Sequence, residues 1–238
     1  MRTILVTGHS KGIGLAITDA LLLSGHTVIG ASRTTIDERE RLEQHTTDLS
    51  DANAVELFAK SLNKAMRTSS ANSHSIDAII CNAGSGEFGA LENFSATQIQ
   101  QNIQLNLVTP LVLLKTLLPG MKQHSRSDII FIASESALQG GRFGSVYSAA
   151  KFGIRGAAQA LRFECAATNC HVGLVNPGMV RTGFFDELNF EPGDASQNAL
   201  QANDVAQAVM SILNAPNNAV IEEINISPLQ HVVKKKRN

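Results

Sequence analysis

The sequence predicts an α/β fold in which a mainly parallel sheet of about seven strands carries helices on both faces. Two observations lead to this prediction. Short apolar runs typical of buried strands alternate with longer stretches of helical periodicity along the chain. No composition break, internal repeat or linker interrupts that alternation over the 238 residues. We therefore expect one doubly wound domain spanning residues 1–238, which is long enough to bury a sizeable core.

The composition excludes several classes of protein. The formal net charge of -1 argues against electrostatic attraction to nucleic acid or anionic membranes. Neither a secretory signal nor an apolar run of membrane-spanning length is apparent, so we expect a soluble, cytoplasmic protein without a nucleic-acid or membrane partner. Three irregularly spaced cysteines, Cys81, Cys165 and Cys170, predict free thiols and neither a disulfide framework nor a metal site.

The first strand, predicted at residues 3–7, leads through a glycine-rich turn into a helix that begins after Gly14. Glycines permit a tight turn and a close approach of the backbone to a ligand, and a helix N-terminus offers unpaired N–H groups. This arrangement is typical of a Rossmann-type loop that binds a pyrophosphate. The candidate cofactor-binding residues are Gly8, Ser10, Lys11, Gly12, Ile13 and Gly14.

The second predicted strand, residues 27–31, completes a strand-helix-strand unit and ends at Ser32 and Arg33. An acidic residue at this position would bind the ribose diol of NAD, but the first carboxylate is that of Asp37. Arg33 suits the 2′-phosphate of NADP, and Lys11 adds a second cation. The sequence therefore favours NADP over NAD, with a solvated loop charge as the alternative for Arg33.

Between the second strand and the next long helix, the pattern is less regular. Residues 36–44 predict a short helix or turn, followed by a brief strand ending at Asp48 and Leu49. Asp48 lies where a side chain reads an adenine amino group, or else it caps the helix predicted at 52–66. The polar residues 67–75 predict an exposed loop without function.

Two buried strands are predicted at residues 76–81 and 128–133. The first delivers Asn82, Ala83 and Gly84 to its carboxyl end, where the ligand crevice of an open α/β sheet lies, and the second delivers Ser134. The helix predicted between them, 96–121, contains Asn106, with Pro110 as a kink or local bulge. A buried Asn106 needs either hydrogen-bond partners in a structural role or a function.

The only tyrosine, Tyr147, precedes Lys151 by four residues in an Ala-rich run that predicts a helix to about residue 167, capped by Ser145. Helical geometry puts both side chains on one face. An ammonium beside a phenol lowers the phenol pKa, which makes Tyr147 a candidate acid and base. The alternative is a chance spacing on a solvated face.

The C-terminal part begins with a strand at residues 171–175 that ends in Asn176, Pro177 and Gly178. Residues 179–203 contain helix breakers and predict a substrate lid with Phe184, Phe185 and Phe190 exposed. A helix capped by Asn203 and Asp204 and a last strand at 219–226 follow. The basic residues 234–238 predict a frayed, solvated tail.

Taken in order, these motifs resemble the short-chain dehydrogenase/reductase family over nearly the whole chain. The matches are the Thr7-Gly-x-x-x-Gly12-x-Gly14 loop, Asp48, Asn82-Ala83-Gly84, Asn106, Ser134, Tyr147-x-x-x-Lys151, and Pro177-Gly178 with Thr182. One departure is Cys81, where the family usually has asparagine.

The resemblance implies a catalytic set of Asn106, Ser134, Tyr147 and Lys151. In this set Tyr147 exchanges a proton with the substrate oxygen, Ser134 hydrogen-bonds that oxygen, Lys151 holds the nicotinamide ribose and lowers the phenol pKa, and Asn106 holds a relay water. It also implies cofactor contacts from Tyr147, Lys151, Pro177, Gly178, Val180 and Thr182.

The expected function is NADP-dependent interconversion of a small-molecule carbonyl and a secondary alcohol. A catalytically silent dinucleotide-binding regulator or scaffold, and an epimerase or dehydratase, are the alternatives. The pocket walls are expected from residues 135–143 and 179–190, where Arg142 or Arg181 is a candidate for contact with an anionic substrate. Family members are often dimers or tetramers, so we expect a homodimer or homotetramer.

Overall fold

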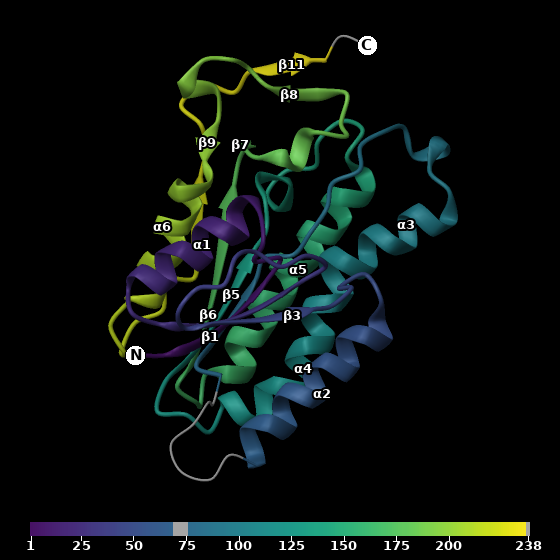
Figure 1. Cartoon of the computed structure of the whole chain (residues 1–238). Coiled ribbons are helices and arrows are strands. Elements are labelled where there is room, and N and C mark those ends of the chain that lie inside the picture. Colours follow the sequence, from purple (N-terminus) through teal and green to yellow (C-terminus); the bar gives the residue numbers. More distant parts are fainter. Residues whose placement is uncertain (69–75, 237–238) are drawn as a thin grey trace.

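The computed structural model describes residues 1–68 and 76–236, and its centre is a seven-stranded parallel sheet (Figure 1). The strand order is β10-β6-β5-β4-β1-β2-β3. The strands are β1 (Thr3–Thr7), β2 (Thr27–Ser32), β3 (Leu42–Thr46), β4 (Ala78–Cys81), β5 (Ser127–Ile132), β6 (Cys170–Pro177) and β10 (Glu223–Ile226). The predicted doubly wound α/β class is confirmed.

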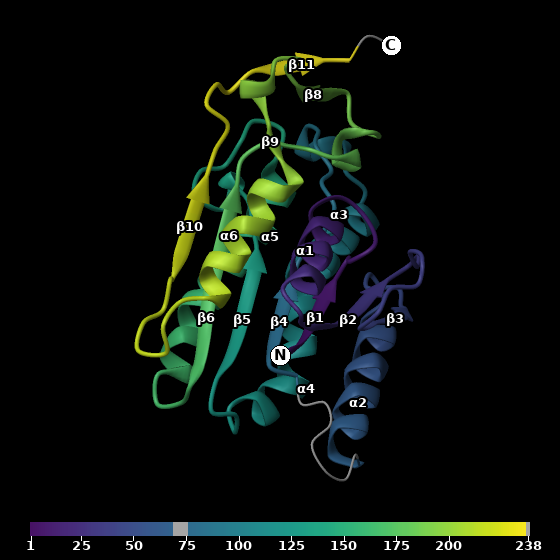
Figure 2. The same ribbon diagram turned by 60° about the vertical axis from the view of Figure 1, so that its left-hand side comes forward.

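Helices cover both faces of this sheet, and Figure 2 shows α1 (Gly12–Leu23) and α6 (Ala202–Leu213) in front of it. The opposite face is covered by α2 (Ala52–Thr68), α4 (Thr109–Met121) and α5 (Ser145–Cys165). Successive side chains of β1 point to opposite faces of the sheet and so contribute to both cores. Ile4 and Val6 pack in the core beneath α1 and α6, whereas Leu5 packs in the core beneath α2, α4 and α5.

The order of strands reverses between β1 and β4, which leaves a crevice at their carboxyl ends. Thr7 links these two ends, since its hydroxyl accepts hydrogen bonds of 3.0 Å from the backbone N–H groups of both Asn82 and Ala83. The Asn82 side-chain amide donates to the carbonyl oxygens of Thr7 and Gly8 at 2.9 and 3.2 Å. The crevice is therefore held by the residues that the sequence marked as candidates.

The long helix predicted at 96–121 is divided into α3 (Ala96–Ile103), a π-helical segment η2 (Gln104–Val108) and α4. The predicted bulge is present and contains Asn106. Pro110 has no N–H to donate to the carbonyl of residue 106, which accounts for an irregular turn there. By length and hydropathy alone Ala96–Met121 is also compatible with a membrane span, but Leu113, Leu114 and Leu117 are buried in the core.

Several element boundaries differ from the predictions. Of the short helix or turn predicted at 36–44, the structure has a turn at residues 40–41, and the strand that follows is β3, which ends before Asp48. The predicted loop begins later than expected because α2 continues to Thr68, and residues 69–75 lie outside the described chain. Gly144, not Ser145, is the N-cap of α5, and the last strand of the sheet, β10, is confined to four residues. At α6, Gln201 is the N-cap, and its backbone N–H donates to Asp204.

Residues 179–203 form short elements above the carboxyl edge of the sheet. They are β7 (Val180–Arg181), η4 (Gly183–Phe185), β8 (Phe190–Pro192), η5 (Ser196–Asn198) and β9 (Leu200–Gln201), and two other short turns are η1 (Leu91–Asn93) and η3 (Glu135–Ala137). The prediction of a frayed tail at residues 234–238 was wrong for residues 234 and 235, because these belong to β11 (Val233–Lys235), antiparallel to β8 (Figure 1). Paired backbone groups and ion pairs of Lys234 hold this segment.

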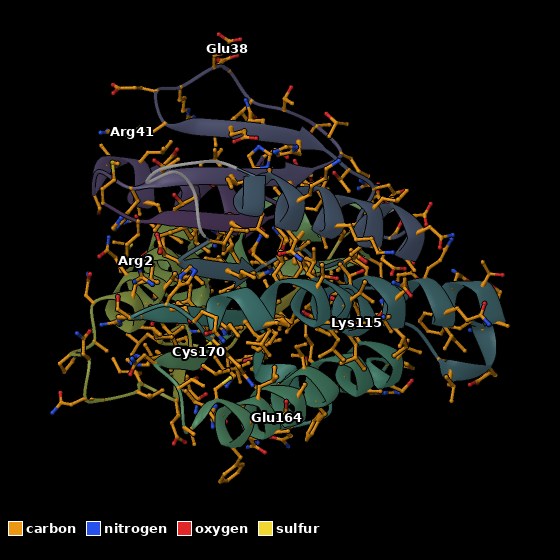
Figure 3. The ribbon with its side chains drawn as sticks, turned by 90° about the horizontal axis from the view of Figure 1, so that it is seen from below. Arg2, Glu38, Arg41, Lys115, Glu164 and Cys170 are labelled. Carbon is orange, nitrogen blue, oxygen red and sulfur yellow. The ribbon has the colours of Figure 1, made fainter. Side chains whose placement is uncertain are left out.

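The opposite, amino-terminal edge of the sheet carries a buried ion network. Figure 3 views the molecule from this side, with Arg2 and Cys170 labelled. Asp128 on β5 is 1% exposed and pairs with Arg2 and with Arg126, the latter at 3.2 Å. The three cysteines are buried and free, as expected.

Candidate active site

The candidate catalytic residues converge at the carboxyl edge of the sheet. Ser134 follows β5, Tyr147 and Lys151 lie in the first turns of α5, and Asn106 lies in the π-helical segment packed beside α5. All but Ser134 are buried. This proximity depends on the fold, because residues 106 and 151 are far apart in the sequence.

Tyr147 is enclosed, with only 7% of its surface exposed. Burial raises the pKa of its phenol to about 12, a hydrogen bond with Ser134 acts in the opposite direction, and the negative charge of Glu135 raises the pKa further. This direction is opposite to the one expected from the Tyr-Lys spacing. The Lys151 ammonium lies over the face of the phenol ring, 5.6 Å from its centroid.

Lys151 lies beneath the site and is 5% exposed. Its ammonium donates to the carbonyl oxygen of Ile132 at 3.1 Å, and burial lowers its pKa to about 8. A Cβ at Gly84 would lie 3.5 Å from Lys151 Nζ and 2.7 Å from Asn106 Oδ1, so glycine is required where these two groups approach the backbone. A cavity of about 10 Å³, enough for roughly one water, is lined by both.

Asn106 combines the two roles that the sequence left open. Its amide N–H₂ donates to the carbonyl oxygens of Ser85 and Asn102 at 2.9 and 3.0 Å, so it braces the backbone. Its Oδ1 is buried and has no hydrogen-bond partner among the described residues. Such an atom is a free acceptor beside a water-sized cavity.

The glycine-rich loop has the backbone geometry of a phosphate cradle. Gly8 and Gly12 have φ values of 69° and 55°, which favour glycine. A Cβ at Gly14 would lie 1.9 Å from the Gly8 carbonyl oxygen. Among the described residues no side chain caps the N-terminus of α1, so its positive end is available to an anion.

The predicted contacts from the C-terminal half lie opposite this loop. Thr182 packs against Gly12, since a Cβ there would lie 3.5 Å from the Thr182 side chain. Pro177 ends β6 and Val180 begins β7, and between them the Gly178 N–H donates to Ile226 at 2.8 Å. Ile13 is partly buried and packs against the core beneath the loop.

The predicted adenosine-binding residues meet at the carboxyl ends of β2 and β3. Arg33 is exposed, and its charge contributes to a lowered pKa of Asp48, whose main cause is a hydrogen bond with Ser50. Asp48 does not cap α2, because Asp51 accepts from the N–H of Asn53 at 2.8 Å. Ser10 bonds to Thr34 at 2.9 Å, and the carbonyl of the buried Leu49 accepts from Thr109 at 2.6 Å.

Sequence reasoning missed His9, a fully buried residue that links the glycine loop to β2 and β3. Its Nε2 lies 2.9 Å from Gln44 Oε1, and its Nδ1 lies 3.1 Å from Ser32 Oγ. Gln44 Oε1 also accepts from the Ile36 N–H, which fixes the amide orientation and makes His9 Nε2 the donor. The sequence feature that could have indicated this contact is Gly30, a glycine within strand β2. A Cβ at this position would lie 2.4 Å from the His9 ring, so the strand needs glycine there.

The two arginines considered for substrate contact are both engaged. Arg181 donates to the carbonyl oxygen of Gly193 at 2.8 Å, and the Arg142 guanidinium lies 4.6 Å from the centroid of the Phe143 ring. The phenylalanines of residues 179–203 are not exposed as the pattern predicted, since Phe185 is buried and Phe184 and Phe190 are partly covered. They form one aromatic cluster with Phe88.

Comparisons with known proteins agree with this geometry. The family model of the short chain dehydrogenases matches residues 2–192. The 3-oxoacyl-[acyl-carrier-protein] reductase of Buchnera aphidicola is 32% identical over 189 residues, covering 79% of this chain and 77% of that protein. The 3-ketodihydrosphingosine reductase of Bacteroides thetaiotaomicron is 31% identical over 186 residues, covering 78% and 66%.

Among solved structures, the alcohol dehydrogenase of Thermococcus sibiricus in complex with 5-hydroxy-NADP superposes with a TM-score of 0.82. The identity is 24%, and the alignment covers 98% of this chain and 99% of that one, so this likeness supports the fold.

The chain belongs to the short-chain dehydrogenase/reductase family. It is an oxidoreductase of the class that uses a nicotinamide dinucleotide to act on CH–OH or C=O groups.

Proposed function

We propose that this protein is an NADP-dependent reductase of small-molecule ketones or aldehydes, reversible as an alcohol dehydrogenase, with Tyr147 as its general acid and base. The proposal rests on the convergence of four residues at the carboxyl edge of the sheet, namely Ser134, Tyr147, Lys151 and Asn106. They lie at the same edge as the glycine-rich loop that leads into the N-terminus of α1. A silent dinucleotide-binding scaffold would not need this buried, costly set of polar groups.

The chain's own groups can perform the proton chemistry. When bound, a reduced nicotinamide supplies a hydride to the carbonyl carbon and becomes the oxidised form. Tyr147 then gives its proton to the carbonyl oxygen, and Ser134 donates a hydrogen bond that stabilises the developing negative charge. The phenol suits this task, since a pKa of about 12 keeps it protonated at neutral pH.

Proton return to Tyr147 is assigned to the buried groups behind it. The Lys151 ammonium, whose pKa of about 8 lies near neutrality, can exchange a proton with a water in the cavity that it shares with Asn106. The free Oδ1 of Asn106 would accept a hydrogen bond from that water. Lys151 would also hold the nicotinamide ribose, as the family resemblance implies.

Replacing Tyr147 with Phe tests the proposal. We expect NADPH oxidation with a panel of ketones and aldehydes to fall by roughly 10²–10⁴-fold, because the acid is lost, while NADPH binding is retained. The binding titration is the control for folding. An unchanged rate would refute the mechanism, and substrate turnover without net NADPH oxidation would indicate an epimerase or dehydratase.

The preference for NADP rests on Arg33, which is exposed directly after β2, where the position that would bind the ribose diol of NAD holds no acidic residue. Replacing Arg33 with Ser should weaken NADPH binding by about tenfold, or ~1.4 kcal/mol, and leave NADH binding nearly unchanged. Fluorescence titration measures both constants, with Arg39→Ser as a control for general charge. Tighter binding of NADH than NADPH by the unaltered protein would refute the preference.

Further proposals follow from the sequence pattern and, for the oligomeric state, from the family resemblance. Residues 1–238 would form one domain with residues 179–203 as its substrate lid, assembled as a homodimer or homotetramer in the cytoplasm. Light scattering on the purified protein measures its assembly, and a monomer would contradict that part.

A further inference from the structure

The phenol of Tyr147 lies under a cluster of phenylalanine rings. The Phe88 ring centroid lies 5.3 Å from that of Tyr147, and the Phe184 centroid lies at 6.1 Å. Phe190 meets the Phe88 ring edge-on at 5.1 Å, and Phe185 contacts both Phe184 and Phe190 at 5.2 and 5.8 Å. A ligand that reaches Tyr147 must therefore displace or contact these rings.

The rings come from segments that are tightly positioned. A Cβ at Gly86 would lie 2.3 Å from Phe184 Cζ, so the backbone next to Phe88 approaches the Phe184 ring as closely as only glycine allows. The Gly89 N–H donates to the carbonyl of Phe143 at 2.8 Å, which ties the Phe88 loop to the residues just before α5. The backbone contacts thus hold the aromatic cluster in place. Its partly exposed rings leave apolar surface that a ligand can contact.

The C-terminal strand holds the same cluster from the other side. Strand β11 pairs with β8, which carries Phe190, and the Lys236 N–H donates to Asn189 at 2.9 Å. The Lys236 ammonium donates to the carbonyl oxygens of Phe185 and, at 3.0 Å, Asp186. Residues that the sequence placed in a free tail therefore fix the position of the lid phenylalanines.

The cations near this surface offer little to an anionic substrate. Arg181 is bound to lid carbonyls, and Arg142 stacks on Phe143. Glu135, whose charge acts on Tyr147, would also repel an anion. The negative charge of Glu135 and the apolar rings both favour a neutral, apolar ligand group next to the reacting carbon.

We propose that Phe88, Phe184 and Phe190 are specificity-determining residues that select carbonyl substrates bearing an aryl or similarly bulky apolar group beside the C=O. This inference rests on the proposed function, because it places the reacting carbon at Tyr147. The substrate's apolar group replaces ring-ring contacts of the cluster and is held by offset or edge-on aromatic packing. Lys236 is a positioning residue, because its hydrogen bonds to the backbone at Phe185 and Asp186 hold the lid rings in place.

The first experiment compares acetophenone with acetone as substrates under NADPH oxidation. The unaltered protein should prefer acetophenone in kcat/KM by at least about 10²-fold, and Phe184→Ala and Phe88→Leu should each reduce that ratio by about tenfold or more. Phe88→Leu preserves an apolar core contact, so it guards against a failure to fold. Phe163→Ala, at an 84% exposed ring on α5, is the matched control. A preference for acetone, or unchanged ratios, would overturn the inference.

Binding separates this inference from the proposed function. In the Tyr147→Phe variant with NADP⁺, which cannot reduce a ketone, calorimetry should show tighter binding of acetophenone than of acetone, and adding Phe184→Ala should reduce the difference. That result supports the aromatic surface even if Tyr147→Phe proves fully active, which would refute only the mechanism. Equal binding of the two ketones with full loss of turnover would overturn the surface and leave the mechanism intact.

The role of Lys236 is tested with a matched pair of substitutions, at Lys236, which follows β11, and at Lys235, the last residue of β11. Lys236→Met removes the two bonds to the lid, whereas Lys235→Met makes the same charge change at the neighbouring, exposed residue. We expect the KM for acetophenone to rise several-fold for Lys236→Met alone, with kcat changed less. Equal effects of the two substitutions would overturn the positioning role.

Discussion

At the scale of single residues, the proton affinity of Tyr147 is set by its surroundings and departs from what its spacing to Lys151 suggests. Burial is the largest cause of its raised pKa, and the charge of Glu135 acts in the same direction. Under the proposed mechanism, the raised pKa keeps Tyr147 protonated and so favours carbonyl reduction at neutral pH. The same mechanism uses the phenolate for alcohol oxidation, which should therefore require alkaline conditions.

Replacing Glu135 with Gln tests this reasoning through pH dependence. Removing a negative charge lowers the pKa of Tyr147, so the rise of kcat/KM for alcohol oxidation with pH should move to lower pH. The acid form needed for reduction should likewise be lost at a lower pH than in the unaltered protein. Glu164→Gln, at the far end of α5 in Figure 3, is the control. A shift of the profile to higher pH would contradict the assignment.

At the scale of elements, the π-helical segment between α3 and α4 turns Asn106 inward. The segment is confined to Gln104–Val108, and its Asn106 braces Ser85 beside the crevice. Helix periodicity with a proline four residues on indicated an irregularity there. It could not indicate which backbone carbonyls the asparagine would meet, since Ser85 comes from another part of the chain.

Replacing Asn106 with Ala should lower both stability and turnover. The carbonyl oxygens of Ser85 and Asn102 would lose their donor, which costs about 1–3 kcal/mol in the free energy of unfolding. Urea denaturation measures this cost, and NADPH oxidation measures turnover. A variant as stable as the unaltered protein would show that the hydrogen-bond bracket contributes little and would leave only the relay role.

At the scale of the whole molecule, the two edges of the sheet have different tasks. The carboxyl edge gathers the site, whereas the amino edge holds Asp128 between Arg2 and Arg126, with His171 at 3.7 Å. Arg126 also donates to the carbonyl oxygens of Leu213 and Ala215, so the network fastens the end of α6 to the sheet. This edge supports the fold without touching the site.

Replacing Asp128 with Asn should destabilise the protein without altering the site. Two arginines would lose their buried counter-charge, which costs about 3–5 kcal/mol in the free energy of unfolding. Urea denaturation measures the loss, and Asp37→Asn, at an exposed carboxylate, should change stability little. If the folded Asp128→Asn variant lost its NADPH affinity at a temperature well below its unfolding transition, the separation of the two edges would be wrong.

Much of the fold and of the candidate site could be predicted from local pattern. The glycine loop, the strand ends at Asn82 and Ser134, and the Tyr147-Lys151 spacing are local features, and parallel strands bring their carboxyl ends to one edge. The β-strand 233–235 could not be predicted, because a short basic segment forms a strand only when a partner such as β8 is present. His9 was missed for a similar reason, since its partners Ser32 and Gln44 lie on two other strands.

The sequence by itself determined the class of protein, because an ordered alternation of strands and helices with fixed motifs at the strand ends permits few topologies. Only the tertiary structure decided the proton affinity of Tyr147, the anchoring of the C-terminal strand and the aromatic cover over the site. These depend on burial and on contacts between distant segments, which no local pattern encodes.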